Sequence, residues 1–187
     1  NEAMADIGGT MLDRQDWQLG EDVIPSGSPY FPSGALRDMA NPHNGGSSFS
    51  DPSYQPEHVN EMYNGSEDNG GVHMNSGIIN HAYYLLAESI SKEKAEKIFY
   101  RALANYMTKS SQFIDCRLAF EQAAKDFYGG SSAEFNAVVT AFFQVGIGEN
   151  SGGGEGSAPP GELPVNPGQD FIVSYDVNAA DPNSLYI

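Results

Sequence analysis

Residues 68–87 read Asp-Asn-Gly-Gly-Val-His-Met-Asn-Ser-Gly-Ile-Ile-Asn-His-Ala-Tyr-Tyr-Leu-Leu-Ala, and they contain the transition that decides the fold. The pair Gly70-Gly71 permits a tight backbone turn. An apolar stripe with helical spacing follows from Ile78 to Leu86. The stretch therefore predicts a loop that passes directly into an amphipathic helix.

The sequence from 75 to 147 continues as a run of amphipathic helices. The second of these helices is expected to turn Leu103 toward its apolar face, and the third to turn Phe127 inward. The fourth begins with Ser131-x-x-Glu134, the pattern of a capping box. A mainly helical bundle is the predicted fold.

The regions around this bundle differ in composition. Residues 1–12 have helix-like spacing, whereas 13–67 are rich in Gly, Pro, Ser, Asn and Asp and predict long irregular loops. We expect 1–147 to form one domain. Residues 148–163 are typical of a flexible linker, and 164–187 resemble the start of a truncated β-domain.

Composition excludes several classes of function. The formal net charge is −16, from nine basic and twenty-five acidic residues, and such a surface repels nucleic-acid phosphates. No apolar run reaches the roughly 20 residues of a membrane-spanning helix. A single cysteine, Cys116, rules out an internal disulfide.

Three groups of polar residues could carry chemistry, and each also has a purely structural interpretation. Glu2 and Asp6 share a helix face, where a solvated acidic surface is the simpler explanation. His73 follows Asp68 closely enough for the carboxylate to hold its ring, in a functional or a structural role. Arg37 could form an ion pair or bind a carbonyl group.

Taken together and in this order, the clusters resemble the thermolysin family of neutral metallopeptidases. The resemblance runs from residue 1 to about 147 and rests on these blocks: Asn1-Glu2-Ala3-x-x-Asp6, Trp17-x-x-Gly20-Glu21-Asp22-Val23, Ala35-Leu36-Arg37-x-Met39, Asp68-Asn69-Gly70-Gly71-Val72-His73-x-Asn75-Ser76-Gly77-Ile78, Ala82-Tyr83-Tyr84-Leu85-Leu86-Ala87, Lys97-Ile98-Phe99-Tyr100-Arg101-Ala102-Leu103 and Ala141-Phe142-x-x-Val145-Gly146.

The resemblance implies a zinc-dependent endopeptidase with a role for each polar cluster. Glu2 would be the third zinc ligand, after two histidines of an H-E-x-x-H helix, and Asp6 would accept from the first of them. His73 would donate to the oxyanion, with Asp68 holding its ring. Arg37 would bind a substrate carbonyl.

The resemblance also bears on substrate and partner. Leu36, Val23 and Leu19 would help to line an apolar pocket for the residue after the cut, in a peptide or protein substrate. No H-x-x-x-H pair exists among the four histidines, His43, His58, His73 and His81. We therefore expect the missing N-terminal half of the catalytic domain to be the partner, and this chain to be inactive alone.

Family members also bind calcium and are secreted, so we expect an extracellular protein. Acids in the region of Asp13, Asp16 and Glu21 are the candidate calcium ligands. Gln18 stands where two-calcium members carry an acid, so at most one ion is expected.

Two other interpretations remain open. The chain could be a non-catalytic helical interaction domain with the same fold, which an upstream sequence without H-E-x-x-H would favour. It could also belong to a surface-adhesion protein that acts through the β-module beginning in 164–187.

Overall fold

A computed structural model of the chain describes residues 1–51 and 53–149. Its elements are five α-helices, two short strands and two 3-10 helices, in the order α1 (Glu2–Leu12), β1 (Gln18–Leu19), β2 (Arg37–Asp38), η1 (Pro42–Gly45), η2 (Val59–Glu61), α2 (Asp68–Ile90), α3 (Lys92–Asn105), α4 (Phe113–Tyr128) and α5 (Ala133–Gln144). The mainly helical fold is confirmed. The predicted β segment, and the predicted linker beyond residue 149, lie outside the described residues.

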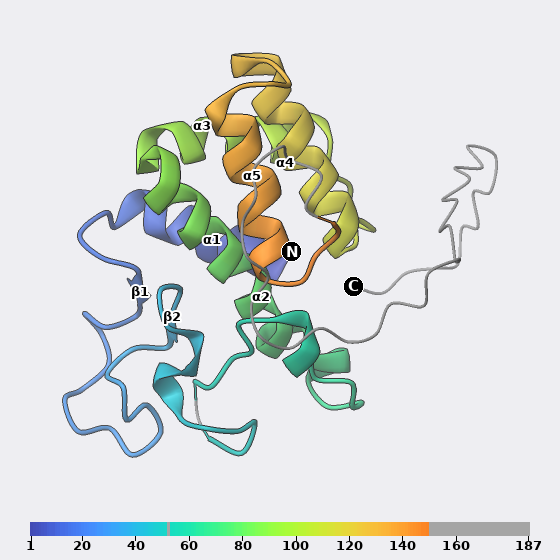
Figure 1. The fold of residues 1–187 in the computed structure, drawn as a ribbon. Helices are drawn as coiled ribbons and strands as arrows, with labels where there is room; N and C mark the ends of the chain where they lie inside the picture. Colours follow the sequence, from blue (N-terminus) through green and yellow to red (C-terminus); the bar gives the residue numbers. More distant parts are fainter. Residues whose placement is uncertain (52, 150–187) are drawn as a thin grey trace.

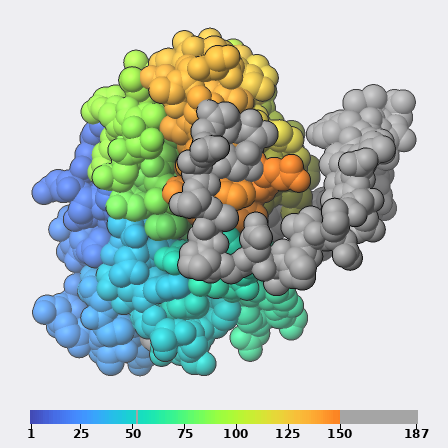
Figure 2. Space-filling view, in the orientation of Figure 1, coloured from blue at the N-terminus to red at the C-terminus, as the bar shows by residue number. Residues whose placement is uncertain are grey.

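Helix α2 is the central element of the bundle. It packs against α1, α3 and α5, and α4 closes the far side by packing against α3 and α5 (Figure 1). The irregular region between α1 and α2 covers one end of the helices, as the blue and cyan surface in Figure 2 shows. The predicted site residues therefore lie near the boundary between the bundle and the loops.

Aromatic side chains join the helices into one core. Tyr83 of α2 contacts Phe99 of α3, with ring centroids 5.9 Å apart. Phe99 lies 6.3 Å from Phe120 of α4, which in turn lies 5.3 Å from Phe142 of α5. Because each of these four helices contributes one ring to the same row, the helices are held as a single unit.

Leu103 and Phe127, which were expected on the apolar faces of their helices, are exposed. Leu103 is 40% exposed, because it lies one residue, or about 100° around the helix, beyond the buried Ala102. Phe127 is 50% exposed in the last turn of α4, and Tyr128 packs against the core there. The helical period identified the buried face but not its limits at the helix edges and ends.

The predicted capping box of the last helix is also displaced by one residue. Ser132, not Ser131, is the N-cap, and its Oγ accepts a hydrogen bond of 3.1 Å from the backbone N–H of Phe135. Glu134 instead forms a 2.7 Å ion pair with Lys94 of α3. The carboxylate therefore connects two helices rather than closing its own first turn.

Within the irregular region, β1 and β2 form a short antiparallel ribbon in which Leu19 is opposite Arg37. Two hydrogen bonds flank this pair, from the N–H of Leu36 to the carbonyl of Leu19 (2.8 Å) and from Met39 to Trp17 (2.9 Å). Met39 is 1% exposed, so the ribbon is anchored to the core. This anchoring fixes the position of Arg37 relative to the helices.

Truncation of the aromatic row should destabilise the fold. Phe120→Ala removes a fully buried ring from the centre of the row, and we expect the free energy of unfolding to fall by about 3–5 kcal/mol. Urea denaturation followed by circular dichroism measures this change. Leu118→Ala is the matched control on the same helix. Because Leu118 is 53% exposed, its truncation should lower the free energy of unfolding by about 0.5 kcal/mol or less. Equal losses in the two variants would contradict the assignment of the core.

Candidate active site

The first turn of α2 has an unusual backbone. Asp68, Asn69, Gly70 and Gly71 have φ angles of 53°, 52°, 85° and 81°, all in the left-handed region that glycine adopts most easily. A Cβ atom on Gly71 would lie 2.8 Å from Cδ1 of Tyr63. This turn lets the chain reverse closely against the preceding loop before the regular helix begins.

The turn brings the carboxylate of Asp68 to His73. Oδ2 of Asp68 accepts from the backbone N–H of His73 at 2.7 Å, and Oδ1 lies 2.6 Å from its Nδ1. Burial alone would raise the pKa of the Asp68 carboxyl, but the hydrogen bonds and charge of His73, with the N–H of Met74, outweigh it and hold the pKa below its ordinary value. The ionised carboxylate thus fixes the orientation of the ring.

The opposite side of the ring faces α1. Nε2 of His73 lies 3.2 Å from Oε2 of Glu2, in the first turn of that helix. The two side chains are partly exposed, at 52% for His73 and 40% for Glu2. A cavity of about 550 Å³ opens beside Glu2, and Asn69 and Val72 also line it. Two residues seventy-one positions apart therefore meet at one accessible site.

Asp6, one turn after Glu2, connects three elements through a single oxygen. Its Oδ2 accepts from Nε of Arg37 at 2.9 Å and from Nδ2 of Asn80 at 2.8 Å. The Oγ of Ser76 lies 3.5 Å away. The ion pair that the residues alone favoured for Arg37 is present, and the acidic face of α1 is thereby partly neutralised.

Sequence reasoning missed Asn80. This residue is 1% exposed and lies among the apolar positions of α2, four residues after the buried Ser76. A buried amide needs a partner, so a polar side chain within an apolar stripe was the available signal. Its partner, Asp6, could be identified only once α1 was seen to pack against α2.

The three predicted pocket residues lie together around the β1–β2 ribbon but differ in exposure. Leu36 is 41% exposed, Val23 is 81% exposed, and Leu19 is partly buried against the core. Leu19 and Leu36 adjoin Arg37 through the ribbon register. Val23 lies in the turn after β1, where its backbone N–H donates to the carbonyl of Gly20 at 3.2 Å.

The candidate calcium ligands are only partly brought together. Carboxylate oxygens of Asp13, Glu21 and Asp22 lie within 4.8 Å of one another, and Oε2 of Glu21 is buried without a hydrogen-bond partner among the described residues. Asp16 is not in this group, and its Oδ1 accepts from the backbone N–H of Gln18 at 2.8 Å. Asp22 is the third member of the group instead, and it was not named among the calcium ligands expected from the sequence.

The sequence matches the family described as thermolysin metallopeptidase, alpha-helical domain, over residues 1–147. It is 43% identical over 162 residues to thermolysin of Alicyclobacillus acidocaldarius subsp. acidocaldarius and 41% identical over 162 residues to bacillolysin of Bacillus cereus. These matches cover 79% of this chain but only 28% and 27% of the relatives.

A similar solved structure is the precursor of protealysin, a metalloproteinase from Serratia proteamaculans. Its TM-score is 0.62 at 29% identity, over 76% of this chain and 46% of that one. The chain therefore belongs to the thermolysin metallopeptidase family and corresponds to its α-helical domain. None of the helices in residues 1–149 combines the length and apolar character needed to cross a membrane.

Removal of the Asp6 carboxylate should loosen the contact between α1 and α2. Asp6→Ala leaves the largely buried guanidinium of Arg37 and the buried amide of Asn80 without their acceptor. At about 1–3 kcal/mol for each orphaned donor, we expect a loss of roughly 2–5 kcal/mol in unfolding free energy. Asp6→Asn keeps an acceptor oxygen and should lose less. Wild-type stability in Asp6→Ala, measured by urea denaturation, would refute this role.

Proposed function

We propose that this chain is part of a secreted zinc endopeptidase and supplies one metal ligand and the donor that stabilises the oxyanion. The observation that carries the proposal is the approach of Glu2 to His73 at 3.2 Å, with Asp68 behind the ring at 2.6 Å. Support also comes from membership of a metallopeptidase family.

The donor atoms at the site suit zinc. Glu2 presents a carboxylate at the edge of an open cavity, and the Asp6 carboxylate lies one helical turn behind it. One ligand from this chain is insufficient, so the others would come from an H-E-x-x-H helix outside it. A zinc ion held there would polarise the scissile carbonyl and lower the pKa of a water molecule.

His73 acts as the electrophilic partner. Its Nδ1 lies 2.6 Å from Oδ1 of Asp68, and its Nε2 lies 3.2 Å from Oε2 of Glu2. Asp68 accepts from Nδ1–H, which leaves Nε2, on the side of Glu2, to donate to the carbonyl oxygen as negative charge develops. Because Asp68 is ionised before substrate arrives, little reorganisation is needed.

Arg37 and its neighbours bind the substrate. Its Nε is held by Asp6, which leaves the terminal nitrogens of the guanidinium to donate to a substrate carbonyl. Leu36, Leu19 and Val23 provide the apolar surface for the side chain after the cleaved bond. Specificity for a bulky apolar residue at that position follows from this surface.

The domain organisation forms part of the same proposal. Residues 1–147 are the helical domain, 148–163 a linker and 164–187 the start of a further domain, and the catalytic base lies in the N-terminal half. The chain alone should therefore leave a fluorogenic peptide uncleaved. An H-E-x-x-H motif ahead of Asn1 distinguishes this proposal from the non-catalytic alternative.

The full-length protein allows the roles of His73 and Glu2 to be separated. His73→Ala should lower kcat by about 10²–10³ while zinc content is retained, because one oxyanion donor is lost. Glu2→Gln should lower zinc content itself. Peptide hydrolysis and atomic absorption measure the two quantities. The control is His81→Gln, on the same helix, since the His81 ring bonds the carbonyl of Met39 through Nδ1 and stacks on Tyr84, and touches neither Glu2 nor Asp68. Unchanged kcat in His73→Ala would remove this residue from the mechanism.

We also propose that Asp13, Glu21 and Asp22 bind one calcium ion. Three carboxylates suit a hard cation that prefers oxygen ligands, and the unpartnered Oε2 of Glu21 indicates a missing contact. Binding would join the end of α1 to the turn after β1. The ion would thereby stabilise the loop that carries Leu19 and Val23.

Calcium should raise the melting temperature of the protein. At a free Ca²⁺ concentration of 100 times Kd, the stabilisation is about 2.7 kcal/mol. Glu21→Gln should abolish this calcium-dependent shift in differential scanning calorimetry. Asp16→Asn is the matched control and should keep the shift, because Asp16 lies outside the group. The same shift in Glu21→Gln as in wild type would disprove the site.

A further inference from the structure

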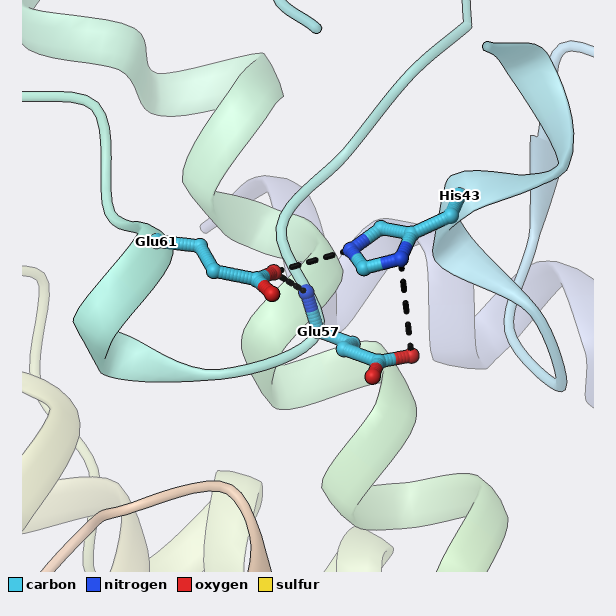
Figure 3. Close-up of side chains that lie close together, drawn as sticks. All are labelled: His43, Glu57 and Glu61. Carbon is cyan, nitrogen blue, oxygen red and sulfur yellow. Dashed lines mark hydrogen bonds and ion pairs between the residues drawn. The ribbon is translucent and has the colours of Figure 1, made fainter. Parts of the chain in front are cut away.

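A second group of potential metal ligands lies in the irregular region and shares no residue with the site at Glu2 or with the acidic cluster of Asp13, Glu21 and Asp22. His43 belongs to η1, and Glu57 and Glu61 belong to the segment that leads into and forms η2 (Figure 3). One ligand atom from each residue lies within 4.8 Å of the other two. The side chains are 34%, 42% and 34% exposed, so an ion in solution can reach them.

The three side chains are held in place by their surroundings. The ring of His43 stacks on Tyr54, with centroids 5.1 Å apart and an interplanar angle of 15°. Oε2 of Glu61 lies 2.8 Å from Nε2 of His43 and accepts from the backbone N–H of Glu57 at 3.0 Å. These contacts reduce the conformational freedom that ion binding would otherwise have to remove.

Negative charge in this region has little local compensation. The sequence contains no lysine or arginine from Asp38 to Ser91, although acidic residues recur through the segment. Arg37, which precedes it, is paired with Asp6. The pKa of the nearby Tyr54 phenol is raised, mainly by burial and to a smaller extent by the charges of Glu61 and Glu57. A cation between the carboxylates would offset this charge.

The distances suit a small divalent ion. Ligand atoms about 2.1 Å from a tetrahedral ion are about 3.4 Å from one another. One ligand atom from each of the three residues lies within 4.8 Å of the other two, so ion binding would draw the set in to about that spacing. Figure 3 shows the two ring nitrogens facing different carboxylates, so an ion on one nitrogen requires the other carboxylate to move toward it.

The donor types identify the class of metal. An imidazole nitrogen with two carboxylates suits zinc and neighbouring transition metals, whereas calcium and magnesium prefer oxygen ligands alone. We propose that His43, Glu57 and Glu61 bind one divalent transition-metal ion of the zinc type, with water in the remaining coordination position. This site is separate from the one proposed for catalysis.

The site would connect two loops that support His73. Between its ligands, Gln55 donates from Nε2 to the carbonyl of His73 at 2.5 Å and to Oγ of Ser76 at 2.9 Å. The backbone N–H of Gln55 donates to Pro42, the neighbour of His43, at 3.0 Å. An ion bound here would therefore stabilise the segment that contacts the start of α2.

Isothermal titration calorimetry with Zn²⁺ tests the proposal in the purified protein. Wild type should bind one equivalent more than His43→Gln, or bind that equivalent at least about tenfold more tightly, since loss of even an outer contact costs 10–100-fold. Glu57→Gln should behave like His43→Gln, and it keeps the backbone contacts. Any zinc bound at Glu2 or at the carboxylates of Asp13, Glu21 and Asp22 is bound equally by all variants, so it does not contribute to the difference between them. The control is Glu67→Gln, which changes an exposed carboxylate outside the group.

Circular dichroism without added metal establishes that each variant is folded. Added Zn²⁺ should raise the melting temperature of wild type and Glu67→Gln more than that of His43→Gln. Equal stoichiometry and affinity in wild type, His43→Gln and Glu57→Gln would overturn the proposal and leave an imidazole between two carboxylates. An extra equivalent of Ca²⁺ with no extra Zn²⁺ would overturn the assigned class of ion.

Discussion

The Oδ2 atom of Asp6 receives hydrogen bonds from β2 and α2 while belonging to α1, and the geometry of the site depends on this convergence. The contact sets the position of α1 along α2, and Glu2 lies one turn earlier on the same helix. The approach of Glu2 to His73 is therefore a consequence of how two helices pack. The same carboxylate orients Arg37, so one oxygen atom positions both the proposed metal ligand and the proposed substrate-binding group.

The rest of the structure divides stability and function between two regions. The aromatic row from Tyr83 to Phe142 joins α2 to α5 through buried ring contacts and serves as the support. The polar residues lie where the irregular region meets that support, and His73 lies two residues after the last of four residues with left-handed backbone conformations. Such backbone is costly, and it is maintained here by the hydrogen bonds of Asp68 and by the close packing of Tyr63 on Gly71.

Local sequence was sufficient for the helices and for the association of Asp68 with His73, because both depend on contacts between near neighbours in the chain. Local sequence was insufficient where the position of a side chain depends on how segments end, turn or pack against one another. Phe127 has the spacing of a core residue but lies at the exposed end of α4. Asp22 joins the acidic cluster, and Asp16 does not, because of how the loop turns. His43 and Glu61 also come together only through loop packing, which hydrophobic periodicity does not encode.

Anomalous diffraction from crystals of the full-length protein grown with zinc tests the central claim most directly. We expect a zinc peak about 2.0–2.2 Å from a carboxylate oxygen of Glu2, with the ring of His73 facing the same cavity and Asp68 still bound to Nδ1. A catalytic zinc with a complete set of ligands that excludes Glu2, or a structure in which Glu2 and His73 face different cavities, would contradict it.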